Sequence, residues 1–130
     1  MPDRIAALII KDKKLLIITG YDESIWWTPG GKADKGEDHI EALKRELKEE
    51  LGVKMEDAKK HDEKVVFNSI AQKPQQVYFY LVEFSGEITP AAEITKFHWL
   101  SADEVGSDKY KLSDVMTGYV IPKLVKSKLL

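Results

Sequence analysis

Hydrophobic residues recur along the N-terminal part of the chain in short runs that predict strands. Isoleucine and leucine dominate residues 4–11 and 14–19, and Asp12-Lys13 between the two runs indicates a hairpin. Residues 25–28 predict another short strand, which we expect Pro29-Gly30-Gly31 to end. The chain therefore opens with sheet-forming segments.

Two longer strand-like runs follow in the middle of the chain. They cover residues 63–71 and 75–84, and a turn around Gln72-Lys73-Pro74 joins them. Both faces of the second run are apolar, which is typical of a strand in the centre of a sheet. Residues 97–100 predict a last short strand, and residues 101–105 a capped turn.

The pattern becomes helical from Asp38 to Leu51, where aliphatic residues recur at spacings of three and four. Gly52 then stands where a helix often ends on a glycine. A terminal helix is expected over residues 114–130, bent or interrupted by Pro122. Strands with intervening helices predict an α/β fold in which helices flank a central mixed sheet.

Length and composition narrow the class of protein. The 130 residues suit a single domain spanning 1–130, and 43% hydrophobic with 32% charged residues is typical of a folded domain. A net charge of −2 gives no strong nucleic-acid signal, and the absence of cysteine excludes thiolate chemistry. No apolar run approaches a membrane span and no signal peptide is visible, so we expect a cytoplasmic protein without membrane contact.

Three glutamates gather on one edge of the predicted helix. At about 100° per residue, Glu46, Glu49 and Glu50 fall beside the apolar arc. Glu46 repels Glu49 and Glu50 by roughly 0.2–0.5 kcal/mol each, and Arg45 offsets only part of this. A hard divalent cation would turn the repulsion into coordination, and Mg²⁺ suits such oxygen ligands, with Mn²⁺ as the alternative.

The segment around this helix carries a specific motif. Its residues follow the pattern Gly-x5-Glu-x7-Arg-Glu-aliphatic-x-Glu-Glu-x-Gly-aliphatic, and every spacing is intact. The matching residues are Gly31, Glu37, Arg45, Glu46, Leu47, Glu49, Glu50, Gly52 and Val53, preceded by Trp26, Pro29 and Gly30. This segment resembles the signature of the Nudix hydrolases, a MutT-like family of pyrophosphohydrolases that cleave diphosphate linkages in nucleotide-like substrates. The resemblance implies an α/β/α sandwich with a loop–helix–loop signature.

The resemblance also implies roles for individual residues. Glu46, Glu49, Glu50 and the carbonyl of Gly30 would bind the metal. Arg45 would orient a glutamate, and Glu37 would tie the loop to the helix, for instance by pairing with Arg45. Glu46 is the first choice for the general base and Glu93 the rival, because a late acid before the last strand often reaches the site in related proteins.

Candidates for substrate contacts lie in and around the motif. Aromatic side chains can stack on a base, and glycine or lysine can approach phosphates. The residues selected for these roles are Gly31, Lys32, Trp27, Tyr78 and Tyr80, with Trp26, Phe67, His61 and His98 as weaker candidates. For all of these aromatic residues, and for the histidines, core packing is the competing interpretation.

The sequence leaves the substrate open. Some relatives that prefer ADP-ribose carry a proline, and some that prefer dinucleoside polyphosphates a tyrosine, at a set distance after the motif. Here that region reads Asn68-Ser69-Ile70, which disfavours both and leaves a nucleoside triphosphate as the leading substrate class. The alternatives are ADP-ribose, a dinucleoside polyphosphate, RNA 5′ ends, or a nucleotide-binding sensor without catalysis. An isopentenyl diphosphate isomerase is disfavoured because it relies on a cysteine. Many family members are homodimers, so a dimer stays open.

Overall fold

Strand β1 (Arg4–Leu8) organises the fold in a computed structural model that describes residues 3–68 and 72–130. It pairs in antiparallel fashion with β4 (Gly30–Lys32) and in parallel with β6 (Lys73–Ser85). The outer partner of β6 is β5 (Lys54–Asn68), which gives the strand order β4-β1-β6-β5. A mixed sheet with β6 inside it was predicted from the sequence and is confirmed.

A second, antiparallel sheet has the order β2-β3-β7. It consists of β2 (Ile10–Lys11), β3 (Lys14–Gly20) and β7 (Ile94–Leu100). The predicted hairpin is present, with Asp12 and Lys13 at φ 52° and 59° in its turn, but it joins only β2 to β3. The chain leaves the first sheet after Leu8, so β1 and β3 do not belong to one hairpin.

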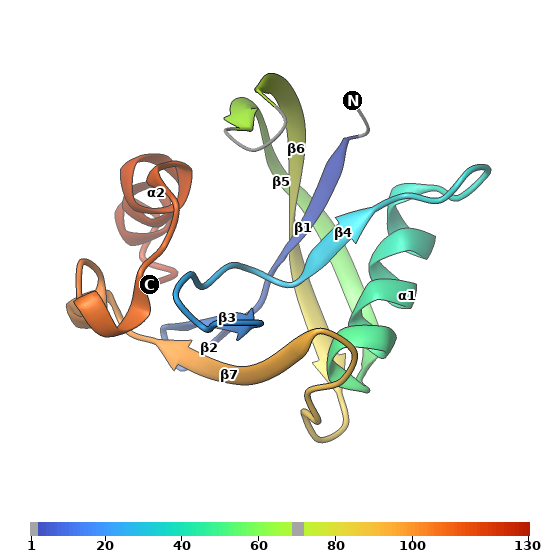
Figure 1. The fold of residues 1–130 in the computed structure, drawn as a ribbon, viewed down its shortest axis with the longest axis horizontal. Coiled ribbons are helices and arrows are strands. Elements are labelled where there is room, and N and C mark those ends of the chain that lie inside the picture. The colour runs from blue at the N-terminus through green and yellow to red at the C-terminus, as the bar shows by residue number, and fades with distance from the viewer. Residues whose placement is uncertain (1–2, 69–71) are drawn as a thin grey trace.

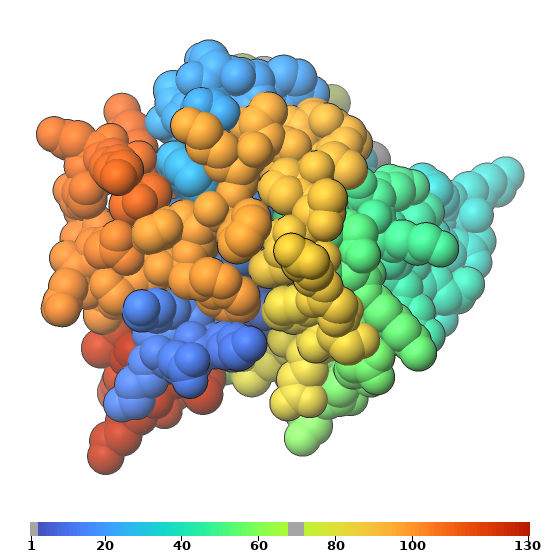
Figure 2. All heavy atoms as spheres, turned by 90° about the horizontal axis from the view of Figure 1, so that it is seen from below, coloured from blue at the N-terminus to red at the C-terminus, as the bar shows by residue number. Residues whose placement is uncertain are grey.

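Helices lie on both sides of these strands. Helix α1 (His39–Leu51) covers one side, and the C-terminal helical segments, which end in α2 (Ile121–Lys126), cover the other (Figure 1). From below, the yellow and orange residues around β7 lie between the green of α1 and the orange-red C-terminal part (Figure 2). This α/β arrangement confirms the predicted fold class. Within the described residues, no helix has the length and apolar character to cross a membrane.

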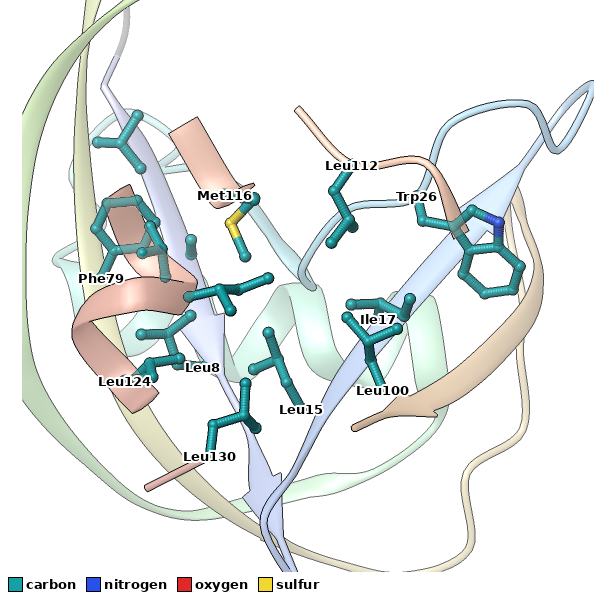
Figure 3. Packing of buried hydrophobic residues seen from close by; sticks show 14 residues of the cluster. Leu8, Leu15, Ile17, Trp26, Phe79, Leu100, Leu112, Met116, Leu124 and Leu130 are labelled. Atoms are coloured by element: carbon teal, nitrogen blue, oxygen red, sulfur yellow. The ribbon is translucent and has the colours of Figure 1, made fainter. Parts of the chain in front are cut away.

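Alternation along β1 divides the core into two clusters. Ile5 and Ala7 face α1, whereas Ala6 and Leu8 face the C-terminal segments. In the second cluster, side chains from both sheets and from the C-terminal segments converge on one apolar volume (Figure 3). The labelled residues of this cluster are Leu8, Leu15, Ile17, Trp26, Phe79, Leu100, Leu112, Met116, Leu124 and Leu130.

Two predicted strands differ most from their observed bounds, while β6 and β7 begin two and three residues before their predicted starts. Residues 25–28 contribute only an isolated bridge between Trp27 and Ile18, and the strand lies instead at Gly30–Lys32. The glycines expected to end a strand thus form one, because Gly30 lets the backbone approach Ile5 closely. Strand β5 begins at Lys54, nine residues before its predicted start, and the predicted end at residues 69–71 lies outside the described residues.

The remaining segments follow the prediction more closely. The turn after β7 is the 3₁₀ helix η1 (Ala102–Glu104), and a second one, η2 (Asp108–Tyr110), follows. The terminal helix is not interrupted at Pro122: the π-helical turn η3 (Met116–Val120) leads directly into α2. A widened turn suits a proline, which has no N–H to donate and crowds the preceding turn.

Candidate active site

Helix α1 is fixed at both ends by local interactions. Asp38 accepts a hydrogen bond from the Glu41 N–H at 2.8 Å, and Glu41 accepts one from the Asp38 N–H, which forms a capping box. Gly52 ends the helix at φ 68°, where a glycine is unstrained. Leu47 and Leu51 on the inner face are fully buried, so the helix presents its glutamates at the edge of this interface.

Glu50 joins α1 to the glycine loop, which here means residues 29–32 and includes β4. Its Oε1 accepts a hydrogen bond from the Gly30 N–H at 3.0 Å, and the residue is only 3% exposed. A Cβ at position 30 would stand 2.1 Å from the Ile5 carbonyl oxygen, and φ there is +137°, so only glycine fits. The close approach of β4 to β1 thus brings the loop within reach of Glu50.

Arg45 holds the same loop from the exposed side. Its Nε and one terminal nitrogen donate to the two oxygens of Glu37 at 2.8 and 2.9 Å. It also donates to the Lys32 carbonyl oxygen at 2.9 Å and to Glu46 Oε1 at 2.9 Å. The Arg45 guanidinium lowers the pKa of Glu37 to about 2. The pairing of Glu37 with Arg45 considered from the sequence is present in the structure.

Glu46, Glu49 and Glu50 form an acidic cluster on α1, and the neighbouring cations do not fully balance its negative charge. Burial raises the pKa of Glu50 to about 7; the Gly30 N–H opposes this shift, and the charges of Glu46 and Glu93 add to it. Burial also raises the pKa of Glu46, against the effect of Arg45. Glu93 therefore lies near both carboxylates, although it is exposed in the loop before β7.

The donor set of this cluster fits a hard divalent cation. Glu46 and Glu50 offer carboxylate oxygens in a partly desolvated place where added positive charge is favourable. Glu49 is more exposed, and one of its oxygens lies 3.4 Å from Arg45. As they stand, no three acidic or histidine side chains of the described residues converge on a single metal position. To share one ion, these side chains would have to leave their bonds to Gly30 and Arg45.

Gly31 and Lys32 lie in the loop that Arg45 and Glu50 hold. A Cβ at Gly31 would stand 2.6 Å from Glu46 Oε1, so this glycine leaves the space that the Glu46 carboxylate occupies. Lys32 contributes its carbonyl oxygen to Arg45, and its side chain is exposed. Both residues therefore lie at the acidic cluster.

A cavity of about 950 Å³ lies between the first sheet and the C-terminal segments. Val77 and Phe79 of β6 line one wall, and Met116 and Tyr119 of η3 line another. Trp27, one of the predicted substrate contacts, also lines it. Its volume lies within the range typical of small-molecule sites, ~300–1,000 Å³.

The structure does not bring Tyr78 and Tyr80 to this cavity. They lie on the opposite face of β6, where Tyr80 OH lies 2.8 Å from His39 Nδ1 and Tyr78 packs on the His39 ring. The reason is the strand period of two: Val77 and Phe79 take the cavity face, so their neighbours point towards α1. Phe67 does line the cavity, whereas Trp26 belongs to the core.

The two histidines considered from the sequence lie outside the cavity. His98 stacks on Tyr110 with ring centroids 4.0 Å apart, and its Nε2 lies 2.9 Å from Glu104 Oε2. His61 lies beside the Asp62 and Tyr119 contact at the back of the cavity wall. Their positions indicate packing roles.

Two parts of the cavity could not be recognised from the sequence. Arg4 was assigned only to a strand, yet its side chain lines the cavity and donates to the Thr28 carbonyl oxygen at 2.9 Å. Residues 114–119 belong to the predicted terminal helix and residues 112–113 to no predicted element, yet residues from this stretch form a wall of the cavity. Neither role could be read locally, because both depend on how distant segments pack.

Fold and site together define a class of protein. An α/β domain presents three glutamates on one helix, a glycine loop hydrogen-bonded to that helix and a cavity lined in part by Arg4 and Trp27, which suits an enzyme for phosphate-containing substrates. Comparison with known families supports this: the model of the NUDIX domain matches residues 1–120. The chain belongs to the Nudix family and is a Nudix hydrolase.

Two named proteins are similar in sequence to this chain. The chain is 48% identical over 46 residues to an 8-oxo-dGTP diphosphatase of Buchnera aphidicola, a match that covers 35% of the chain and only 37% of that relative. It is 26% identical over 118 residues to an asymmetrical bis(5′-nucleosyl)-tetraphosphatase of Caenorhabditis elegans, covering 81% of the chain and 86% of the relative. Both relatives are named for nucleotide substrates.

Solved structures support the fold. A NUDIX hydrolase from Nitrosomonas europaea superposes with a TM-score of 0.81 over 98% of this chain and 90% of its own. The two sequences are 18% identical, so this similarity concerns the fold alone.

Proposed function

We propose that this hydrolase cleaves a phosphoanhydride bond of a nucleoside triphosphate, with Mg²⁺ or Mn²⁺ held by the acidic cluster. Glu46, Glu49, Glu50 and the Gly30 carbonyl would hold the ion. When bound, the ion would neutralise charge on the diphosphate and on the leaving phosphate. The observation that carries this proposal is the environment of the buried Glu50. Its carboxylate accepts a hydrogen bond from Gly30, and the negative charges of Glu46 and Glu93 act on it.

The protein's own residues then move the proton. Water adds across the anhydride: its oxygen forms a bond to one phosphorus, the bridging P–O bond breaks, and a carboxylate takes the proton. We assign this role to Glu46 because burial raises its pKa above the usual value while Arg45 fixes its orientation. Glu93 is the rival, since it lies near Glu46 and Glu50.

The nucleoside would occupy the cavity. Trp27 and Phe67 offer aromatic surface there, and Phe67 is 64% exposed, so its ring is accessible for stacking on a base. Gly31 and Lys32 in the loop would contact the phosphates, since they lie at the acidic cluster. Tyr78 and Tyr80 have no part in this proposal because they face α1.

A dinucleoside polyphosphate is the second candidate substrate. The observation in its favour is the similarity to the tetraphosphatase of C. elegans, which extends over 81% of the chain. One nucleoside of such a substrate would lie in the cavity, and the second would extend into solvent. ADP-ribose and RNA 5′ ends are further substrates to test.

A substrate panel with Mg²⁺ tests the proposal. It holds the common nucleoside triphosphates, 8-oxo-dGTP, a dinucleoside tetraphosphate, ADP-ribose and 5′-triphosphorylated RNA, with release of phosphate and diphosphate as the readout. We expect one triphosphate to be preferred by the wild type and Glu50→Gln to be inactive. Glu41→Gln is the matched control, because Glu41 serves only the helix cap. Binding without turnover of any compound would support a sensor instead.

A further inference from the structure

Arg4 lies where the acidic cluster and the cavity meet. It is the first residue of β1 and pairs with Lys32 of β4 on one side and Val77 of β6 on the other. Strand β4 carries the glycine loop, and Val77 lines the cavity. Arg4 shares its face of β1 with Ala6, so its side chain points to the cavity side of the sheet.

The Arg4 guanidinium has hydrogen-bonding capacity to spare. Among residues 3–68 and 72–130, its one hydrogen-bond acceptor is the Thr28 carbonyl oxygen at 2.9 Å. A guanidinium has five N–H donors in a planar fork, and this fork matches two oxygens of a phosphate. Arg4 pairs with Lys32 of β4 and bonds to Thr28, so it lies beside the strand that Glu50 and Arg45 hold. Burial lowers the pKa of Arg4, and the charges of Glu50 and Glu46 oppose this shift.

We propose, on the basis of the proposed function, that Arg4 binds the phosphate that joins the nucleoside to the diphosphate, which is the α-phosphate of a nucleoside triphosphate. A nucleoside in the cavity and a diphosphate at the glutamates leave this phosphate between the two, beside Arg4. By fixing it, Arg4 would determine which phosphorus lies at the acidic cluster. It is thus a substrate-binding residue outside the Nudix signature.

A purely structural role for Arg4 gives different expectations. If Arg4 only balanced the charges of Glu50 and Glu46, its replacement would change their environment but not the affinity gained from a substrate phosphate. Binding in EDTA separates the two, because the ion then takes no part. The informative quantity is the ratio of the Kd of a nucleoside to the Kd of its 5′-monophosphate.

Isothermal titration in EDTA with guanosine, GMP, adenosine and AMP measures this ratio. We expect Arg4→Gln to lower it about ten- to a hundred-fold, the range for loss of a charged hydrogen-bonded pair, while the nucleoside Kd changes less than about twofold. Arg4→Lys should restore part of the ratio, since a lysine keeps the charge and loses the fork. Lys11→Gln, an exposed cation on β2, is the control and should leave the ratio unchanged.

An unchanged ratio in Arg4→Gln overturns the proposal, as does a wild type that binds GMP and AMP no better than the nucleosides. Far-UV circular dichroism shows whether each variant folds, and Arg4→Lys carries the test if Arg4→Gln does not. Turnover separates the two proposals. If the wild type is active and Arg4→Gln has unchanged KM and kcat, only the role of Arg4 is rejected. If the Kd ratio falls in Arg4→Gln but the wild type cleaves no compound of the panel, only the proposed function is rejected.

Discussion

The Gly30 N–H donates a hydrogen bond to Oε1 of Glu50 at 3.0 Å, across twenty positions of sequence. This bond joins the glycine loop to the acidic helix and holds Glu50 beneath the loop at 3% exposure. The same burial raises the pKa of Glu50 to about 7. The buried carboxylate of the proposed metal site thus makes the metal-free protein less stable than its packing alone would.

Glu50→Gln should stabilise the metal-free protein at pH 8. A carboxyl whose pKa is raised from 4.5 to about 7 on folding favours the folded state less as pH rises through that window, because the folded protein binds the proton more tightly. The gain for glutamine is on the order of 2–3 kcal/mol at pH 8 and close to zero below pH 4.5. Urea unfolding in EDTA at both pH values measures it; an equal difference at both would contradict the prediction.

The two glycines of the loop should respond differently to alanine. At Gly30 a Cβ would stand 2.1 Å from a backbone oxygen at φ +137°, so Gly30→Ala should destabilise the fold by roughly 2–4 kcal/mol. At Gly31 the Cβ would meet the Glu46 side chain at 2.6 Å, which can move away. Gly31→Ala should keep stability within about 1 kcal/mol and lower turnover at least about tenfold. Thermal unfolding and kcat are measured for both variants. A stable Gly30→Ala, or a Gly31→Ala with unchanged kcat, would contradict the prediction.

Glu37→Gln should weaken the link between loop and helix in a pH-dependent way. The depressed pKa of Glu37, about 2, means that its pairing with Arg45 adds stability above pH 4.5, and that this is lost as pH falls towards 2. The difference in urea midpoint between wild type and variant should therefore be present at pH 7 and shrink at pH 3. Glu87→Gln, an exposed loop carboxylate, is the control; a difference as large at pH 3 as at pH 7 would reject the assigned role.

Asp62→Asn should loosen one wall of the cavity. Asp62 accepts hydrogen bonds from Tyr119 OH at 2.5 Å and Lys123 Nζ at 2.6 Å, which fasten the C-terminal segments to β5. Tyr119 lines the cavity, whereas Asp62 does not, so the variant should raise KM several-fold while kcat stays within about twofold. Steady-state kinetics on the preferred nucleotide gives both constants, and a fall in kcat at constant KM would refute the prediction.

Local patterns predicted α1 and its acidic edge well. The capping residues, the leucine spacing and Gly52 all act within a few residues of one another, so their outcome does not depend on distant segments. The family signature likewise lies within one continuous segment. Strand β5 was predicted too short, because its first half is rich in lysine and acidic residues, as edge strands often are.

Contacts that depend on register could not be predicted. The sequence places Tyr78 and Val77 side by side, but only the pairing of β6 with β1 decides which of them faces the cavity. The same holds for Arg4, whose importance follows from β4 and β6 lying on either side of β1. Tertiary packing determines these features, and no local pattern encodes it.

Turnover as a function of Mg²⁺ concentration tests whether Glu50 belongs to a catalytic metal site. After EDTA treatment, the wild type and Glu41→Gln should be inactive and recover with added Mg²⁺, while folded Glu50→Gln should stay inactive at every concentration. Near-wild-type turnover by folded Glu50→Gln, or full turnover in EDTA, would contradict the account.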